Sequence, residues 1–339
     1  MPKLLFILKR REDYSAPTHA TIGLSTGLYN SAKFMDNMMK DMGFESELEV
    51  AIDNNCIDRL VNKHKPTHVI IEALWVVPSK FSVLQKLHPN VTWIVRLHSE
   101  MPFMSGEGIA MDWIIEYSKF KNVLVACNAP RMTREVAMII GDAKTIYLPN
   151  YYPQDYVTKE FDKNKEYIDV GCFGAIRPLK NQLLQAFAAL HFAERIGKKL
   201  RFHVNVGRIE MNGDPVKNNI RTLFEQLADT GHQLINHQWT PREEFLKLCA
   251  TMDIGLQCNF SETFNIVSAD LISQGVPIVG SKEIPWSSFI SNADPNDSAD
   301  ISDMLVFAYC FPQLNVKLNQ RNLRKYTDKT KKIWYKYFN

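Results

Sequence analysis

Short apolar runs alternate with helical patterns along most of the 339 residues, and no other feature constrains the fold as strongly. In the first half, the apolar runs occupy residues 3–9, 67–74, 91–97, 122–128 and 145–149. In the second half, they occupy residues 167–175, 200–207, 253–259 and 276–281. Near-continuous apolar strands separated by helices are typical of parallel sheets that are covered on both faces. The alternation therefore predicts an α/β protein with two doubly wound, Rossmann-like domains.

The segment PNYYPQDY, residues 149–156, interrupts the alternation with two prolines and indicates a linker. We expect a first domain over residues 1–150, a second over 151–315, and a final helix over 316–339 that packs back on the first domain. The stretch RKYTDKTKKIWYKYFN (324–339) mixes six cations with aromatic residues that include Trp334, Tyr335, Tyr337 and Phe338, which also suits a nucleic acid or a membrane surface. A facing arrangement of the two domains would form a ligand cleft at the carboxyl ends of their strands.

The composition, 45% hydrophobic and 23% charged, is that of a soluble globular protein. The formal charge of +3 is too small to imply a polyanionic partner by itself. No apolar run approaches the ~20 residues that span a bilayer. The six cysteines form no CxxC pair and predict buried thiols without a metal site, as in a reducing, cytoplasmic compartment.

Two carboxylates, Glu262 and Asp270, lie eight residues apart in FSETFNIVSADLISQGVPIVGS, where a strand is expected to pass into a helix. The free N–H groups of the first helical turn and the helix dipole favour an anion, most simply a phosphate. Carboxylates beside that site can accept hydrogen bonds from hydroxyl groups. This combination suits a nucleotide sugar, whereas the alternative is a helix-start acid with an unrelated surface acid.

This segment resembles the signature of the large group of retaining glycosyltransferases with the GT-B fold, in which two acids flank seven residues and Gly-Val-Pro follows. Glu262 and Gly275–Pro277 match the signature, whereas Asp270 stands in place of the usual Glu, and Asn265 in place of a common Gly. The resemblance implies a nucleotide-diphosphate sugar donor, most simply a UDP-sugar. It assigns the sugar hydroxyls to Glu262 and the ribose to Asp270. The turn at Thr263, Phe264, Asn265 and Ile266 would line the donor.

A second segment, GCFGAIRPLKNQ (171–182), places Gly174, Arg177 and Lys180 after the first strand of the second domain. Gly174 permits a close approach of the backbone, and the two cations can neutralise a departing diphosphate without a metal. The alternative is a solvated basic loop. The segment resembles the strand, Gly, basic residue and Lys pattern of the same glycosyltransferases, although Arg177 is displaced towards Lys180.

Three further residues are candidates on weaker grounds. His98 follows a strand of the first domain, where the resemblance implies a contact with the donor sugar; a structural histidine is the alternative. Gly27 in GLSTGLYNSA lies in a loop that can approach the diphosphate or the acceptor. Trp239 precedes an expected capping box at residues 240–243, with Pro at the first helical position, and can stack on the donor base or serve as a core aromatic.

These features predict a metal-independent, retaining hexosyl- or pentosyltransferase that needs no cofactor besides its donor. The acceptor is expected to be a saccharide or, from a fainter resemblance to proteins of tailed bacteriophages, a hydroxymethylated DNA base. A sugar-nucleotide epimerase and a non-catalytic nucleotide-sugar-binding protein are the alternatives. The oligomeric state is left open.

Overall fold

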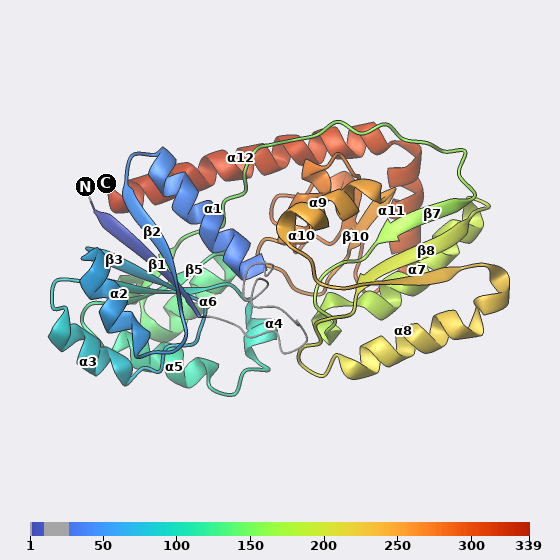
Figure 1. Ribbon diagram of the computed structural model, residues 1–339. Helices are drawn as coiled ribbons and strands as arrows, with labels where there is room; N and C mark the ends of the chain where they lie inside the picture. Colours follow the sequence, from blue (N-terminus) through green and yellow to red (C-terminus); the bar gives the residue numbers. More distant parts are fainter. Residues whose placement is uncertain (1, 10–26) are drawn as a thin grey trace. The chain divides into compact units, whose positions relative to one another are not determined.

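The structure is a computed structural model that describes residues 2–9 and 27–339 (Figure 1). Contacts divide the chain into two compact units. The first unit comprises Met1–Pro153 together with Thr327–Asn339, and the second comprises Gln154–Tyr326. The last helix, α12 (Pro312–Phe338), therefore contributes residues to both units.

The first unit contains a six-stranded parallel sheet in the order β2-β1-β3-β4-β5-β6. Its strands are β1 (Lys3–Lys9), β2 (Glu45–Ala51), β3 (His68–Glu72), β4 (Thr92–Leu97), β5 (Val123–Cys127) and β6 (Thr145–Tyr147). Its helices are α1 (Gly27–Asp41), α2 (Cys56–His64), α3 (Lys80–Leu87), α4 (Met101–Met104), α5 (Ala110–Ser118) and α6 (Pro130–Ile140).

Side chains of its central strands alternate between two apolar clusters. Leu5 and Ile7 of β1 enter one cluster, and Leu4 and Phe6 enter the other. This is the arrangement expected of strands with a helical layer on each face, since successive side chains of a strand point to opposite sides. It explains the near-continuous apolar runs.

The second unit contains a five-stranded parallel sheet in the order β11-β10-β7-β8-β9. Its strands are β7 (Tyr167–Gly171), β8 (Lys199–Asn205), β9 (Gln233–His237), β10 (Ile254–Gln257) and β11 (Ile278–Gly280). Its helices are α7 (Gln182–Arg195), α8 (Asp214–Gln226), α9 (Arg242–Thr251), α10 (Ile266–Ser273) and α11 (Ser298–Cys310), with short 3₁₀ turns that include η3 (Pro178–Lys180). The expected α/β architecture with two Rossmann-like domains is thus confirmed.

The aromatic residues near the C-terminus divide between the core and the surface. Trp334 and Phe338 are buried in the core of the first unit, and the Trp334 indole N–H donates to the Pro149 carbonyl at 2.9 Å. The side chains of Tyr335 and Tyr337 remain exposed. Trp334 and Phe338 are therefore core residues and not part of a surface for a partner.

Two local expectations are wrong. The capping box at residues 240–243 does not form, because α9 begins at Arg242 with Pro241 as its N-cap and no side-chain cap hydrogen bond. All six cysteines are free thiols, but Cys310 is exposed and Cys56 only partly buried.

Within residues 2–9 and 27–339, no helix combines the length and the apolar character needed to cross a membrane.

Candidate functional site

Lys180 and Glu262 meet at the carboxyl edge of the sheet in the second unit. Lys180 ends η3, which follows β7, and Glu262 lies in the turn between β10 and α10. Oε1 of Glu262 accepts hydrogen bonds from Lys180 Nζ, from Asn259 Nδ2 at 2.7 Å and from Asn265 Nδ2 at 3.3 Å. Oε2 accepts no hydrogen bond from any residue that the structure describes. The side chains of Lys180 and Glu262 are 13% and 10% exposed, so both are shielded but reachable.

A group of buried amides orients Glu262. Asn259 and Asn265, its two amide donors, are 1% and 4% exposed, and Asn265 also donates to Oε1 of the fully buried Gln257 at 3.2 Å. Satisfied networks of buried polar groups hold side chains in one geometry. Oε1 is therefore held by the protein, and Oε2 is the oxygen that can accept hydroxyl groups.

Asn265 occupies the left-handed backbone region, with φ of 60°, where Gly is otherwise preferred. It is the N-cap of α10, since its Oδ1 accepts from the Ser268 N–H at 2.9 Å. One first-turn donor is thus used within the chain. Any anion at this helix start has to be bound by the N–H groups that precede Ser268.

Gly174 and Arg177 follow β7 in the same loop. Gly174 has φ of +117°, in the region that favours glycine, and a Cβ placed there would meet none of the described residues within 4 Å. Arg177 forms an ion pair with Glu210 at 3.0 Å. The structure therefore brings Lys180, not Arg177, to the carboxylate of Glu262.

Asp270 is engaged by a residue that sequence reasoning overlooked. Its side chain is 4% exposed and forms an ion pair with Arg242, the first residue of α9. Trp239 lies just before that helix, with the Arg208 guanidinium 5.8 Å from its ring centroid. The Trp239 indole N–H is buried without a partner among the described residues. The residue as a whole is only partly buried, so Trp239 is not a fully enclosed core aromatic.

In the first unit, His98 belongs to a buried polar group at the carboxyl ends of β3 and β4. Its Nε2 is hydrogen-bonded to Oε2 of Glu72, whose side chain is fully buried. Arg96, directly opposite Glu72 in the strand register, donates from Nη1 to both Glu72 oxygens at 3.1 Å. Sequence reasoning missed Glu72, although an acid that ends an apolar strand was a visible signal.

The pKa values of this group reflect its burial. Burial favours the neutral form of Glu72, but the charges of Arg96 and His98 outweigh this effect and hold the pKa of that carboxyl below its usual value. Burial lowers the pKa of His98, and Arg96 acts in the same direction, against the attraction of Glu72. Both directions favour an ionised glutamate beside a neutral imidazole.

The described residues show few contacts for the remaining candidate, Gly27, and for a metal site. Gly27 is the first residue of α1, so it belongs to a helix and not to a loop, and residues 23–26 before it lie outside the described residues. Across the described ranges, no group of three or more His, Cys, Asp or Glu side chains has the geometry to hold a metal ion.

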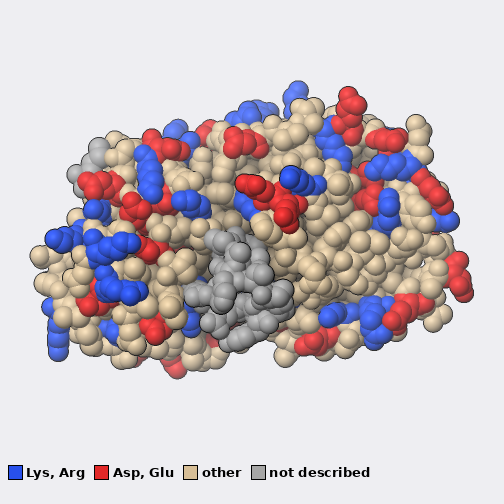
Figure 2. All heavy atoms as spheres, viewed as in Figure 1, with Lys and Arg blue, Asp and Glu red and all other residues tan. Residues whose placement is uncertain are grey.

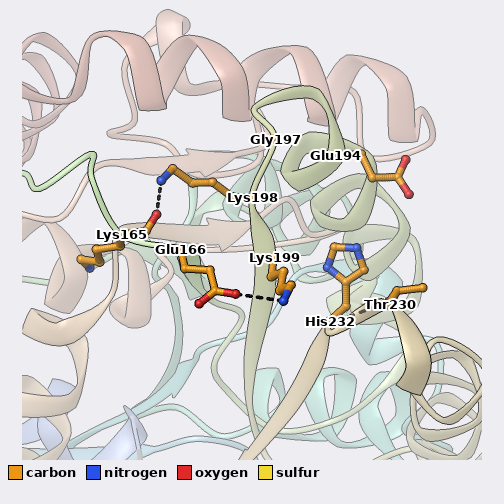
Figure 3. A pocket seen from close by; sticks show the side chains of 8 residues that line it. All are labelled: Lys165, Glu166, Glu194, Gly197, Lys198, Lys199, Thr230 and His232. Atoms are coloured by element: carbon orange, nitrogen blue, oxygen red, sulfur yellow. Dashed lines mark hydrogen bonds and ion pairs between the residues drawn. The ribbon is translucent and has the colours of Figure 1, made fainter.

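A hollow of about 310 Å³ lies elsewhere on the second unit (Figure 3). It is lined by Lys165, Glu166, Glu194, Gly197, Lys198, Lys199, Thr230 and His232. Lys199 begins β8 and His232 precedes β9, so the hollow lies at the amino ends of parallel strands. It is therefore at the edge of the sheet opposite to Glu262.

Neither a protein-family model nor a curated protein sequence matches the chain. Solved structures match its fold over nearly the whole length. An α,α-trehalose-phosphate synthase (UDP-forming) from Burkholderia vietnamiensis aligns with a TM-score of 0.68 and 11% identity, covering 100% of this chain and 96% of the other. The chain has the GT-B fold.

Two other solved structures also match the fold of this chain. Sucrose-phosphate synthase from Thermosynechococcus elongatus aligns with a TM-score of 0.70 and 10% identity, covering 99% of this chain and 98% of the other. HepE from Anabaena, solved in complex with UDP-glucose, aligns with a TM-score of 0.63 and 13% identity over 99% and 97% of the two chains. At these identities the similarity concerns the fold.

Proposed function

We propose that this protein is a glycosyltransferase that moves a sugar from a nucleotide-diphosphate sugar, most simply a UDP-sugar, to an acceptor hydroxyl. The observation that carries the proposal is the meeting of Lys180 with Glu262 at the carboxyl edge of the second sheet. Ligands of open α/β sheets bind at that edge. Lys180 is a cation that can bind a phosphate, and Glu262 is a carboxylate that can accept hydrogen bonds from hydroxyl groups. The two side by side suit a ligand in which a sugar is linked to a diphosphate.

Each group has a specific role in this proposal. Lys180 stabilises the negative charge that develops on the departing nucleoside diphosphate, as a preorganised cation does in a shielded site. Oε2 of Glu262 accepts hydrogen bonds from sugar hydroxyls, while Asn259 and Asn265 hold Oε1. Arg177 assists at the phosphates only after release from Glu210. Retention and independence of metal follow from the family resemblance and belong to the proposal.

We propose a saccharide as the acceptor. The proteins of similar fold include sugar-phosphate synthases, by their names, and a complex with UDP-glucose. A DNA base is less well supported, because the net charge is only +3 and positive and negative side chains are interspersed on the face shown in Figure 2. Charge is thus not concentrated into one basic surface on that face.

Calorimetric titration with UDP and UDP-glucose, with and without a chelator, tests the donor. We expect both ligands to bind in either condition, and Lys180→Met to weaken both by about ten- to a hundredfold, since a charge-assisted hydrogen bond contributes ~1.5–3 kcal/mol. Lys199→Met is the control, because Lys199 pairs with Glu166 at the opposite edge of the sheet. Loss of binding in the chelator would contradict independence of metal.

The same ligands distinguish the alternatives. A transferase releases UDP from UDP-glucose faster when a suitable saccharide is added. An epimerase converts the sugar of the nucleotide sugar without any acceptor, which NMR of the anomeric protons detects. Binding of UDP-glucose without turnover on a saccharide panel would favour the non-catalytic alternative.

A further inference from the structure

Asp169, His203 and His237 form a line of hydrogen bonds across three strands of the second unit. His203 Nε2 lies 3.0 Å from Asp169 Oδ1, and His203 Nδ1 lies 2.9 Å from His237 Nε2. In the strand register, Asp169 of β7 lies opposite Arg201 of β8. His237, the last residue of β9, lies opposite Asn205, which ends β8. The line therefore runs diagonally from within the sheet to its carboxyl edge, the edge proposed for the donor.

Asp169 is the anionic end of this line. Its Oδ1 lies 2.8 Å from Arg201 Nε, its Oδ2 accepts from Arg201 Nη2 at 3.0 Å, and Lys165 Nζ lies 3.8 Å from Oδ2. A buried carboxylate with these cationic partners is ionised and can only accept hydrogen bonds. His203 therefore donates to Asp169 from Nε2.

One proton lies between the two imidazole rings. Their planes differ by 12° and their centroids are 5.1 Å apart, so the facing nitrogens, at 2.9 Å, meet edge to edge in nearly one plane. In the neutral pair, His203 carries its proton on Nε2, so its Nδ1 accepts and His237 donates from Nε2. Nδ1 of His237 is then unprotonated. Burial, together with the charge of His203, lowers the pKa of His237 and favours this neutral form.

The ring of His237 is also held by Phe173. The two ring centroids are 5.9 Å apart with planes at 70°, and Phe173 is 1% exposed. Gly171 leaves room for Phe173, since a Cβ there would lie 2.6 Å from Phe173 Cε2. His237 itself is only partly buried, and its Nδ1 forms no hydrogen bond with any residue that the structure describes. This nitrogen can therefore accept a hydrogen bond from a ligand.

The strand order places His237 on the nucleoside side of the proposed donor. Glu262 follows β10, Lys180 follows β7, and the sheet order is β10-β7-β8-β9. With the sugar at Glu262 and the diphosphate at Lys180, the nucleoside extends towards β8 and β9, because the diphosphate links the two. At ~4.8 Å per strand, β9 lies about 10 Å from β7. Trp239, two residues after the end of β9, adds an aromatic surface that suits a planar base.

We propose that Asp169 and His203 are positioning residues and that His237 selects the base of the donor. The unprotonated Nδ1 of His237 accepts a hydrogen bond from the N3–H of uracil, the single N–H between its two carbonyl groups. The assignment of the base rests on the proposed glycosyltransferase function. The tautomers of the two histidines do not depend on that function.

Histidine-selective ¹⁵N NMR of the ligand-free protein at about pH 8, above the usual pKa of an imidazole, tests the tautomers. His203→Gln and His237→Phe identify the signals of each ring by their loss. We expect both rings to carry their proton on Nε2, with a nitrogen–nitrogen coupling across the hydrogen bond between them. Protonation of His237 on Nδ1 at this pH would overturn the proposal.

Calorimetry with UDP and N3-methyl-UDP tests the contact with the base. The wild type should bind UDP about tenfold more tightly, because the methyl group removes the N–H. His237→Phe keeps a ring against Phe173 but removes the acceptor, so the difference between the two ligands should disappear. His191→Phe, at an exposed position on α7, is the control and should keep the difference. Equal binding of both ligands by the wild type, or a difference that persists in His237→Phe, would overturn the assignment.

Two variants of His203 test its positioning role. His203→Gln can donate its amide to Asp169 and accept from His237 through its oxygen, so the affinity for UDP should stay near that of the wild type. His203→Met can do neither and should weaken UDP by about threefold or more. Equal affinities in these two variants would contradict the role of His203. A wild type that does not bind UDP would refute the proposed donor and the base contact together, while the NMR experiment would still decide the tautomers.

Discussion

Lys180 donates a hydrogen bond to Oε1 of Glu262, which lies 82 positions later in the sequence. The cation proposed for the diphosphate and the carboxylate proposed for the sugar therefore neutralise each other in the absence of ligand. A phosphate has to compete with Glu262 for Lys180. This competition makes the effects of single substitutions at the two positions unequal.

Glu262→Gln should weaken UDP-glucose but not UDP. The substitution releases Lys180 from its ion pair, so the affinity for UDP should stay equal or rise. The sugar loses a charged acceptor, and the affinity for UDP-glucose should fall by about ten- to a hundredfold. Calorimetry with both ligands measures the difference, and Glu225→Gln, in an exposed pair with Arg221, is the control. Equal losses for the two ligands would contradict the assignment of Glu262 to the sugar.

The ion pair of Asp270 with Arg242 raises the question of whether Asp270 binds ribose or only stabilises the fold. A double-mutant cycle of Asp270→Asn and Arg242→Met should give a coupling free energy of about 1 kcal/mol or more, because the two side chains are in contact. Urea unfolding measures it. If Asp270 also holds the ribose, Asp270→Asn should weaken UDP and UDP-glucose alike, whereas Arg242→Met should preserve both affinities. Equal effects of the two variants on nucleotide binding would indicate a purely structural pair.

Asp169 should make the stability of the second unit depend on acidity. Burial opposes its ionisation, but the hydrogen bond from His203 and the charge of Arg201 outweigh this and hold the pKa of Asp169 below its ordinary value of 3.8. The folded state thus binds this proton less readily than the unfolded state. The stabilisation is present above pH 3.8 and is lost as the pH falls through the folded pKa.

Urea unfolding between about pH 3 and pH 6 measures this dependence. Asp169→Asn should lower the free energy of unfolding at the upper end and flatten the decline towards acid. Asp303→Asn removes an acid that is 65% exposed and should reproduce the wild-type slope. An equally steep decline in Asp169→Asn would show that other groups cause it.

Trp334 should be the stabilising contact of the C-terminal helix. It is fully buried, lies 5.9 Å from Phe6 between ring centroids, and donates to the Pro149 carbonyl. Trp334→Ala should cost about 3–5 kcal/mol of unfolding free energy, and Trp334→Phe about 1 kcal/mol for the lost hydrogen bond plus a packing change. Tyr335→Ala, at an exposed position, should stay within about 0.5 kcal/mol of the wild type. A small effect of Trp334→Ala would contradict a structural role of the helix.

The sequence by itself determined the fold class, because strands buried on both faces must be apolar throughout, as in β1, β3 and β4. The same criterion missed β2, a polar edge strand with the sequence ESELEVA and several exposed residues. The places of Glu262, Lys180 and His98 beyond the carboxyl ends of strands were predictable from the apolar runs before them, and their roles at a ligand site stay predictions. These local signals are carried by a few consecutive residues.

Only the tertiary structure decided which charges are paired. Arg177 contacts Glu210, Arg242 contacts Asp270, and Glu72 accepts from both Arg96 and His98. The partners come from different strands and loops, and their encounter depends on strand order and register, which a linear pattern does not contain. The energy of a buried charge depends on its distance to the opposite charge, so the roles of these residues follow from the fold and not from their types.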